Sequence, residues 1–271
     1  MRVKAIQDLA QLSDDALFEE VAEETASFRF MSKMTAGQRN MASGQGAIAL
    51  HFNRWVERRL ELPSVALPDL RHERDPEAAA AAVRQHWGLG QQPIKNLVHL
   101  LESKGVRLFS LSIDAAEVDA FSMWKETIPF VFLNTRKSAE HSRFDAAHEL
   151  GHLLLHRHAA PAGREAEADT FASAFLVPRG SVLAHAPRFV TLEQLIRLKR
   201  IWTVSLSALT YRLHAVRLLS DWRSGWVATL ADEITSEYAL GSLSANLGHS
   251  GSEPSERMDS LVFLVDAAHG R

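Results

Sequence analysis

Two histidines four residues apart, with a glutamate directly after the first, are the residues of this sequence best suited to chemistry. They are His148, Glu149 and His152. Residues four apart on a helix lie on nearly the same face, so both imidazoles can reach one tetrahedral zinc ion. Glu149 is rotated by about 100° from His148 and reaches the open coordination site. There a carboxylate can take a proton from water and later hand it to a leaving amine. The spacing therefore predicts a zinc-dependent endopeptidase.

The residues around this motif favour a metal site over an ordinary helix. Phe144, Ala147, Leu150 and Leu154 make the helix apolar. Histidines on such a helix would be buried without partners unless something binds them. We therefore expect the two histidines to hold a metal.

Zinc needs a third protein ligand, which we expect downstream. The segment 164–178 is predicted to be a second helix and carries Glu165, Glu167 and Asp169. Glu165 and Asp169 are four residues apart, so one carboxylate can bind the metal while the other orients a histidine through its second ring nitrogen. Glu167 is rotated by about 200° from Glu165, so only one of them can face the zinc. The pairing with Asp169 favours Glu165, and Glu167 is the alternative.

The elements that must position these residues follow from the spacing of apolar side chains. Residues 14–60 are predicted to be helical, and the segment 61–76, which contains three prolines, is predicted to be a linker or a wrapped loop. Asp75 and Pro76 are a typical helix start. Helices are predicted at 76–87, 93–103, 138–157, 165–176, 191–201 and 205–219.

Three short runs of β-branched and aromatic residues precede the motif helix, at 106–112, 118–124 and 129–134. They predict a small, largely antiparallel sheet. The expected fold class is therefore α+β, mainly helical, with this sheet before the helix that carries His148.

The chain divides into three regions by composition. We expect a helical N-terminal region over residues 1–70, a metallopeptidase domain over 71–220 and a C-terminal region over 221–271. The last region has a polar, glycine- and serine-rich linker followed by an apolar strip at 260–269, which could dock as a strand.

Bulk composition limits the other functions. Hydrophobic residues make up 46% of the 271 residues, charged residues 23%, and the net charge of -3 gives no global basic field for nucleic acid. The absence of cysteine excludes disulfides, thiolate zinc ligands and a cysteine nucleophile. No run reaches the roughly 18 apolar residues of a membrane span, and the first residues lack a signal peptide pattern. We expect a soluble cytoplasmic protein.

The stretch HELGHLLLH, followed by EAEADTFASAFLVP, resembles the ImmA/IrrE family of zinc metallopeptidases over roughly residues 90–215. This resemblance implies a zincin-like fold. It also implies that Glu165, the first glutamate of the family's E-x-x-A-[ND] pattern, is the third zinc ligand. The family usually has asparagine where this chain has Asp169, and the aspartate resembles the E-x-x-x-D arrangement of thermolysin-like enzymes.

The resemblance also implies a narrow substrate range. Members of the family typically cleave a helix-turn-helix repressor encoded beside them, which releases phage, stress or defence genes. The alternative is a non-cleaving, regulatory or toxin-like binding partner of a helix-turn-helix protein. The presence of Glu149 favours the enzyme, because a pure binding module has no need for a general base.

Other residues give weaker signals. Tyr211 and Arg212 are candidate oxyanion stabilisers. Residues 191–213 could pass for a helix-turn-helix, although their leucines are explained by packing. His156 and His158 are expected to turn away from the metal as solvated or capping residues. Nucleic acid is a candidate activator because several basic side chains could bind phosphate. These are Arg197, Lys199, Arg200, Arg212 and Arg217.

Overall fold

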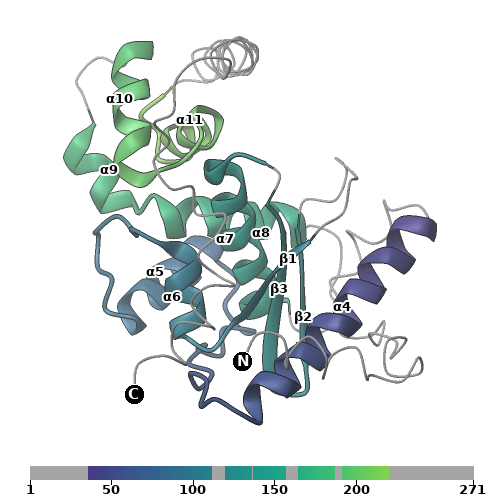
Figure 1. The fold of residues 1–271 in the computed structure, drawn as a ribbon. Coiled ribbons are helices and arrows are strands. Elements are labelled where there is room, and N and C mark those ends of the chain that lie inside the picture. The colour runs from purple at the N-terminus through teal and green to yellow at the C-terminus, as the bar shows by residue number, and fades with distance from the viewer. Residues whose placement is uncertain (1–35, 112–119, 136, 157–163, 187–190, 220–271) are drawn as a thin grey trace.

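The protein has the predicted α+β architecture, with helices on both faces of a small sheet (Figure 1). The structure, a computed structural model, describes residues 36–111, 120–135, 137–156, 164–186 and 191–219. In chain order these residues form α4 (Ala36–Glu57), α5 (Pro76–His86), α6 (Leu97–Ser103), β1 (Arg107–Leu111), β2 (Ala120–Lys125), β3 (Ile128–Asn134), α7 (Ala139–Leu155), α8 (Arg164–Leu176), α9 (Arg179–His185), α10 (Leu192–Trp202) and α11 (Leu206–Ala215).

The sheet is mixed, and the expectation of a largely antiparallel sheet is wrong in this respect. Its strand order is β1-β3-β2, with β2 antiparallel and β1 parallel to β3. A tight turn at Glu126, whose φ is 55°, folds β3 back on β2. The strongly apolar β3 takes the central position, where both of its edges are paired. β1 must therefore pair with the other edge of β3, and it runs in the same direction.

Side chains alternate between the two faces of the sheet, as strand geometry requires. Phe121 and Met123 belong to a small core with Leu50 of α4, while Ala120 and Val131 belong to the main core with α7 and α8. Figure 1 shows α4 on one side of the sheet and α7 and α8 on the other. The central strand β3 is thus buried on both faces, which explains its continuous apolar sequence, whereas β1 is partly exposed.

The segment between α4 and α5 is a wrapped loop, one of the two forms predicted. The Trp87 indole N–H donates to Ala66 O over 3.0 Å, and Ala66 N donates to Lys104 O over 2.9 Å. A Cβ on Gly105 would lie 2.6 Å from Ser64 O, and the φ of Gly105 is +82°. Glycine is therefore required at this close approach.

The predicted helix boundaries agree with the structure to within a few residues. Asp75 caps α5 by accepting from Glu77 N, and Pro76 is its first residue, as predicted. The helix predicted at 93–103 begins later, at Leu97, because Asn96 is its N-cap. Helix α9 was not predicted, because its seven residues are too few to show helical periodicity.

Two predicted features lie wholly or partly outside the described residues. The helix predicted over 14–60 is observed as α4 in its described part, and residues 14–35 are not described. The predicted C-terminal region, including the strip at 260–269, is not described either. The domain boundaries at 70 and 220 stay predictions. Among the helices of the described ranges, none combines the length and apolar character that a membrane span needs.

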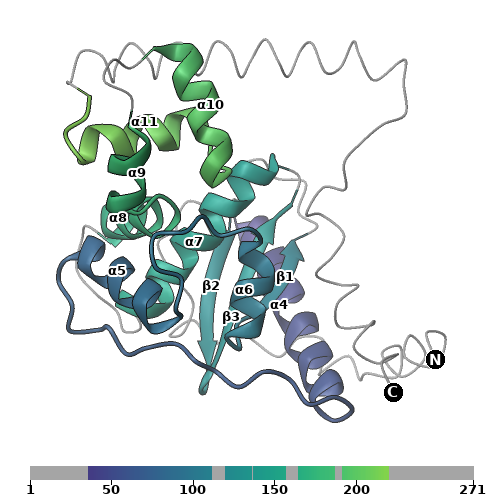
Figure 2. The same ribbon diagram turned by 90° about the vertical axis from the view of Figure 1, so that its left-hand side faces the viewer.

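Helices α9, α10 and α11 gather at one end of the molecule, next to α8 (Figure 2). A buried arginine ties this group to α5. Arg212, which is 1% exposed, donates its Nη2 and Nη1 to the two oxygens of Glu77 over 2.8 and 3.2 Å. Its Nε donates to Val177 O over 2.8 Å. Arg212 is therefore committed to holding three elements together.

We expect Glu77→Ala to lower the free energy of unfolding by about 2 kcal/mol, because a buried guanidinium loses its charged partner. Arg212 lowers the pKa of Glu77 by hydrogen bonding. This contribution is therefore present above the ordinary pKa of a glutamate and is lost as the pH falls below it. Urea unfolding at neutral pH measures the difference.

Glu193→Ala is the matched control, because Glu193 pairs with Arg197 on the exposed surface of α10. It should cost less than about 1 kcal/mol. Equal effects of the two substitutions on the free energy of unfolding would show that the buried pair stabilises the fold no more than an exposed pair does.

Candidate metal centre

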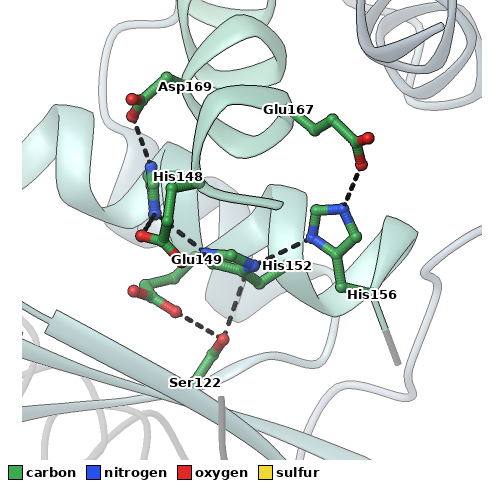
Figure 3. Close-up of polar contacts among 8 residues, drawn as sticks. Ser122, His148, Glu149, His152, His156, Glu167 and Asp169 are labelled. Carbon is green, nitrogen blue, oxygen red and sulfur yellow. Dashed lines mark hydrogen bonds and ion pairs between the residues drawn. The ribbon is translucent and has the colours of Figure 1, made fainter. Parts of the chain in front are cut away.

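His148 and His152 lie one turn apart on α7 and point to the same side of the helix (Figure 3). Ala147, Leu150 and Leu154 on this helix are fully or almost fully buried, so α7 is fixed in the core. The two Nε2 atoms are 3.0 Å apart. The apolar helix thus holds two imidazole nitrogens against one another at the edge of the core.

Glu165 joins these histidines from α8. Its Oε2 is 3.7 Å from His148 Nε2, and its Oε1 is 3.6 Å from His152 Nε2. One ligand atom from each of the three residues lies within 4.8 Å of the others, so this group could hold a metal ion. The structure therefore brings together the three residues that were predicted to bind zinc.

The geometry and chemistry of this group fit zinc. Ligands about 2.0–2.1 Å from a tetrahedral ion are about 3.3 Å from one another, and the observed separations of 3.0, 3.6 and 3.7 Å lie around that value. Two imidazoles and one carboxylate form a known catalytic zinc set, with the fourth position left for water or substrate. The donor atoms therefore suit a catalytic rather than a closed structural site.

Asp169 lies behind His148, at the position expected for an orienting carboxylate. Its Oδ1 is 2.8 Å from His148 Nδ1. An ionised carboxylate can only accept a hydrogen bond, so Nδ1 of His148 carries a proton toward Asp169, and Nε2 is the nitrogen left to bind a metal ion. Burial disfavours charge on His148, but its hydrogen bonds to Asp169 and Glu165 outweigh burial and raise its pKa. Burial lowers the pKa of His152, which keeps that ring neutral. The local field thus favours one positive charge at this point.

Glu149 is 4% exposed and contacts a serine that was not predicted to belong to the site. Ser122 of β2 donates its hydroxyl to Glu149 Oε2 over 2.6 Å. Burial raises the pKa of Glu149 to about 7, against the effects of His148 and Ser122. A hydroxyl in the middle of an apolar strand, on the face shared with Ala120, was the signal that could have identified Ser122.

His156 is the C-cap residue of α7, which is one of the two forms expected for it. It is not solvated, because its side chain is only 4% exposed. Its Nδ1 is 3.0 Å from His152 Nδ1, and its Nε2 is 2.7 Å from Glu167 Oε2. Glu167 is not part of the three-residue group, in line with its predicted rotation away from Glu165. His158 lies outside the described residues.

The remaining candidates lie on α10 and α11. Tyr211 is 49% exposed, and its role as an oxyanion stabiliser stays a prediction. Arg212 is buried against Glu77, which leaves it unable to reach a phosphate or a substrate oxyanion. Lys199 is paired with Glu140. The leucines of the segment 191–213 are buried, as packing between two helices requires: Leu195, Leu198, Leu206, Leu209 and Leu213.

The metal assignment predicts one zinc ion per chain. Glu165→Gln should weaken zinc binding by more than about 100-fold, beyond the effect of losing an outer hydrogen-bond partner. Titration against a chromophoric chelator measures the affinity. Glu193→Gln, on the exposed surface of α10, is the control and should bind zinc like the parent chain. Unchanged affinity in Glu165→Gln would mean that the third ligand is another residue.

The elements that carry the three-residue group also match a known protein family. Residues 101–214 match the model of the family described as Peptidase M78, IrrE N-terminal-like domain. The match runs from the end of α6 into α11 and contains the whole three-residue group. No curated protein gave a significant match to the chain. The predicted resemblance to the ImmA/IrrE family is confirmed, and residues 101–214 are an IrrE N-terminal-like peptidase domain.

Proposed function

We propose that the protein is a zinc-dependent endopeptidase in which Glu149 is the general base. The observation that carries this proposal is the position of Glu149, next to His148 in sequence and held by Ser122 at 2.6 Å. A carboxylate fixed beside a three-ligand metal group is what peptide hydrolysis needs. In a purely binding protein, burial of this carboxylate would cost desolvation free energy, and no proton transfer would make use of it.

His148, His152 and Glu165 would hold the zinc ion, which supplies a Lewis acid for polarising water and the scissile carbonyl. Glu149 accepts the proton of the attacking water and then gives it to the leaving nitrogen. Its raised pKa of about 7 suits both steps near neutral pH. Ser122 restrains the carboxylate so that it need not reorganise between them.

The substrate would bind along β2. Within the described sheet this strand pairs only with β3, so its second edge is not used by another strand. Ser122 and Trp124 both contact α7 from β2, the latter through its indole N–H to Leu153 O at 3.2 Å. A peptide that extends this edge through backbone hydrogen bonds would therefore lie beside Glu149. This mode requires an exposed or unfolded segment in the target.

A helix-turn-helix repressor with a flexible linker offers such a segment, whereas a compact protein does not. We infer that the substrate is one neighbouring repressor, whose cleavage would relieve repression of a stress, phage or defence operon. Arg197 and Arg200 on α10 support nucleic acid as an activator, because phosphates attract such exposed charges.

Glu149→Gln should retain the fold and the zinc but lose peptide cleavage by about 10²- to 10⁴-fold, because the water loses its base. Zinc content and urea unfolding of this variant should match those of the parent chain. Glu193→Gln again serves as the control with full activity. Cleavage at the parent rate by Glu149→Gln would exclude Glu149 as the base. A parent chain that binds the repressor but never cleaves it would favour the non-cleaving alternative.

The substrate proposal is tested with two proteins, the helix-turn-helix repressor encoded beside this gene and unfolded casein. We expect discrete cleavage of the repressor, faster when DNA is present, and little degradation of casein under either condition. Stimulation by DNA would identify nucleic acid as an activator. Rapid digestion of casein without any effector would contradict a regulated protease with a single target.

A further inference from the structure

One pair of polar side chains beside the metal centre takes no part in the proposed proton transfers. His156 directly follows α7, and Glu167 lies on α8 two residues after Glu165. Figure 3 shows the two side chains in contact on the side of His152 that faces away from His148. The three residues form a chain in which Glu167 Oε2 is 2.7 Å from His156 Nε2, and His156 Nδ1 is 3.0 Å from His152 Nδ1.

The direction of these hydrogen bonds is set by the carboxylate of Glu167, which lies at the end of the chain. An ionised Glu167 can only accept, so His156 donates its Nε2–H. Nδ1 of a neutral His156 then has only a lone pair, so it accepts from Nδ1–H of His152. This leaves Nε2 of His152 unprotonated, with a lone pair that can bind a metal. The same Nε2 atom is 3.0 Å from His148 Nε2 and 3.6 Å from Glu165 Oε1. The contact with Glu167 therefore selects the tautomer of His152 that can bind a metal.

The same logic holds on the other side of the centre, where Asp169 contacts His148 directly. Every second residue of α8 from 165 to 169 thus carries a carboxylate that faces the histidines of α7 or the one that follows it. Glu165 faces the centre, Asp169 lies behind one histidine, and Glu167 lies behind the other through an added imidazole. Partners of this kind fix the tautomer and ring orientation of metal-binding histidines.

We propose that His156 and Glu167 form a relay that positions His152 as a metal ligand. This inference rests on the zinc site of the proposed function. The alternative is that the pair only ties α7 to α8. The two roles affect different quantities. A purely structural tie contributes to the stability of the fold, whereas a positioning relay contributes to zinc affinity and to the ligand field of the metal.

The first experiment measures zinc affinity by chelator competition for His156→Ala, Glu167→Ala and the double variant. Each single variant should bind zinc about 10- to 100-fold more weakly. Two controls should bind like the parent: His141→Ala, an exposed histidine near the start of α7, and Glu193→Ala. Loss of urea stability with unchanged zinc affinity would reduce the pair to a structural tie and overturn the proposal.

The double variant separates a relay from a simple charge effect. Because Glu167 acts through His156, removing Glu167 should have no further effect once His156 is alanine. Additive losses would mean that Glu167 attracts the cation independently, which contradicts the relay. Glu167→Gln keeps an acceptor oxygen and should lose less affinity than Glu167→Ala.

Substitution with Co²⁺ gives a readout that a structural tie would not alter. The visible absorption of the bound cobalt should change in His156→Ala, because the His152 ring is free to rotate, and stay unchanged in His141→Ala. Identical spectra in all variants would overturn the relay. A parent chain that binds neither zinc nor cobalt would overturn the proposed function itself, whereas a parent that binds both with unaltered variants overturns the relay alone.

Discussion

Gly151 lies where α7 passes α8, and a Cβ built on it would come within 3.1 Å of Phe171 Cδ1 and 3.3 Å of the Ala168 Cα. The two helices can approach this closely only because a glycine faces an alanine at the crossing. His148 and His152 flank Gly151 in sequence, and Glu165 and Asp169 flank Ala168. The carboxylates of one helix therefore reach the imidazoles of the other at the point of closest approach. A Cβ at Gly151 would require Phe171 or Ala168 to move by a few tenths of an ångström, which would shift the two helices and their donor atoms relative to one another.

The polar residues of the site are each held by a partner from another element. Asp169 connects α8 to His148, Glu167 connects α8 to His156, and Ser122 connects β2 to Glu149. A buried polar group without a partner costs about 1–3 kcal/mol, so these contacts stabilise the buried side chains of Ser122, Glu149 and His156. The same contacts fix the geometry that catalysis requires before any substrate arrives. Stability and function thus depend on the same hydrogen bonds.

The mixed sheet places the edge that we propose for substrate binding beside the candidate metal centre. With β3 in the middle, β2 is left at an edge, and its Ser122 and Trp124 turn toward α7. A purely consecutive antiparallel sheet would have placed β2 in the centre, paired on both sides. The order β1-β3-β2 therefore keeps one edge next to Glu149 free of other strands in the described sheet. Aromatic packing of Phe121 on Phe132, with ring centroids 4.4 Å apart, secures this edge from the opposite face.

Local sequence signals determined the elements and indicated the candidate metal group. The spacing of His148 and His152 and the four-residue step from Glu165 to Asp169 depend only on helical geometry, so the metal group could be predicted without a structure. The helix cap at Asp75 and the three strands were also predicted from short sequence patterns. The role of Asp169 behind a histidine was predicted, but which histidine it contacts was decided by the crossing of α7 and α8.

Only the tertiary structure decided the long-range features. The parallel pairing of β1 with β3, the contact of Ser122 with Glu149 and the chain from His152 through His156 to Glu167 all join residues from separate elements. From helical rotation alone, His156 was expected to be a solvated or capping residue that turns away from the metal, and Glu167 was the alternative to Glu165 as the third ligand. The rotation was right, but each residue meets the other because two helices pack at a glycine. Sequence periodicity gives the direction of a side chain on its own helix, whereas its partner depends on how the helices pack.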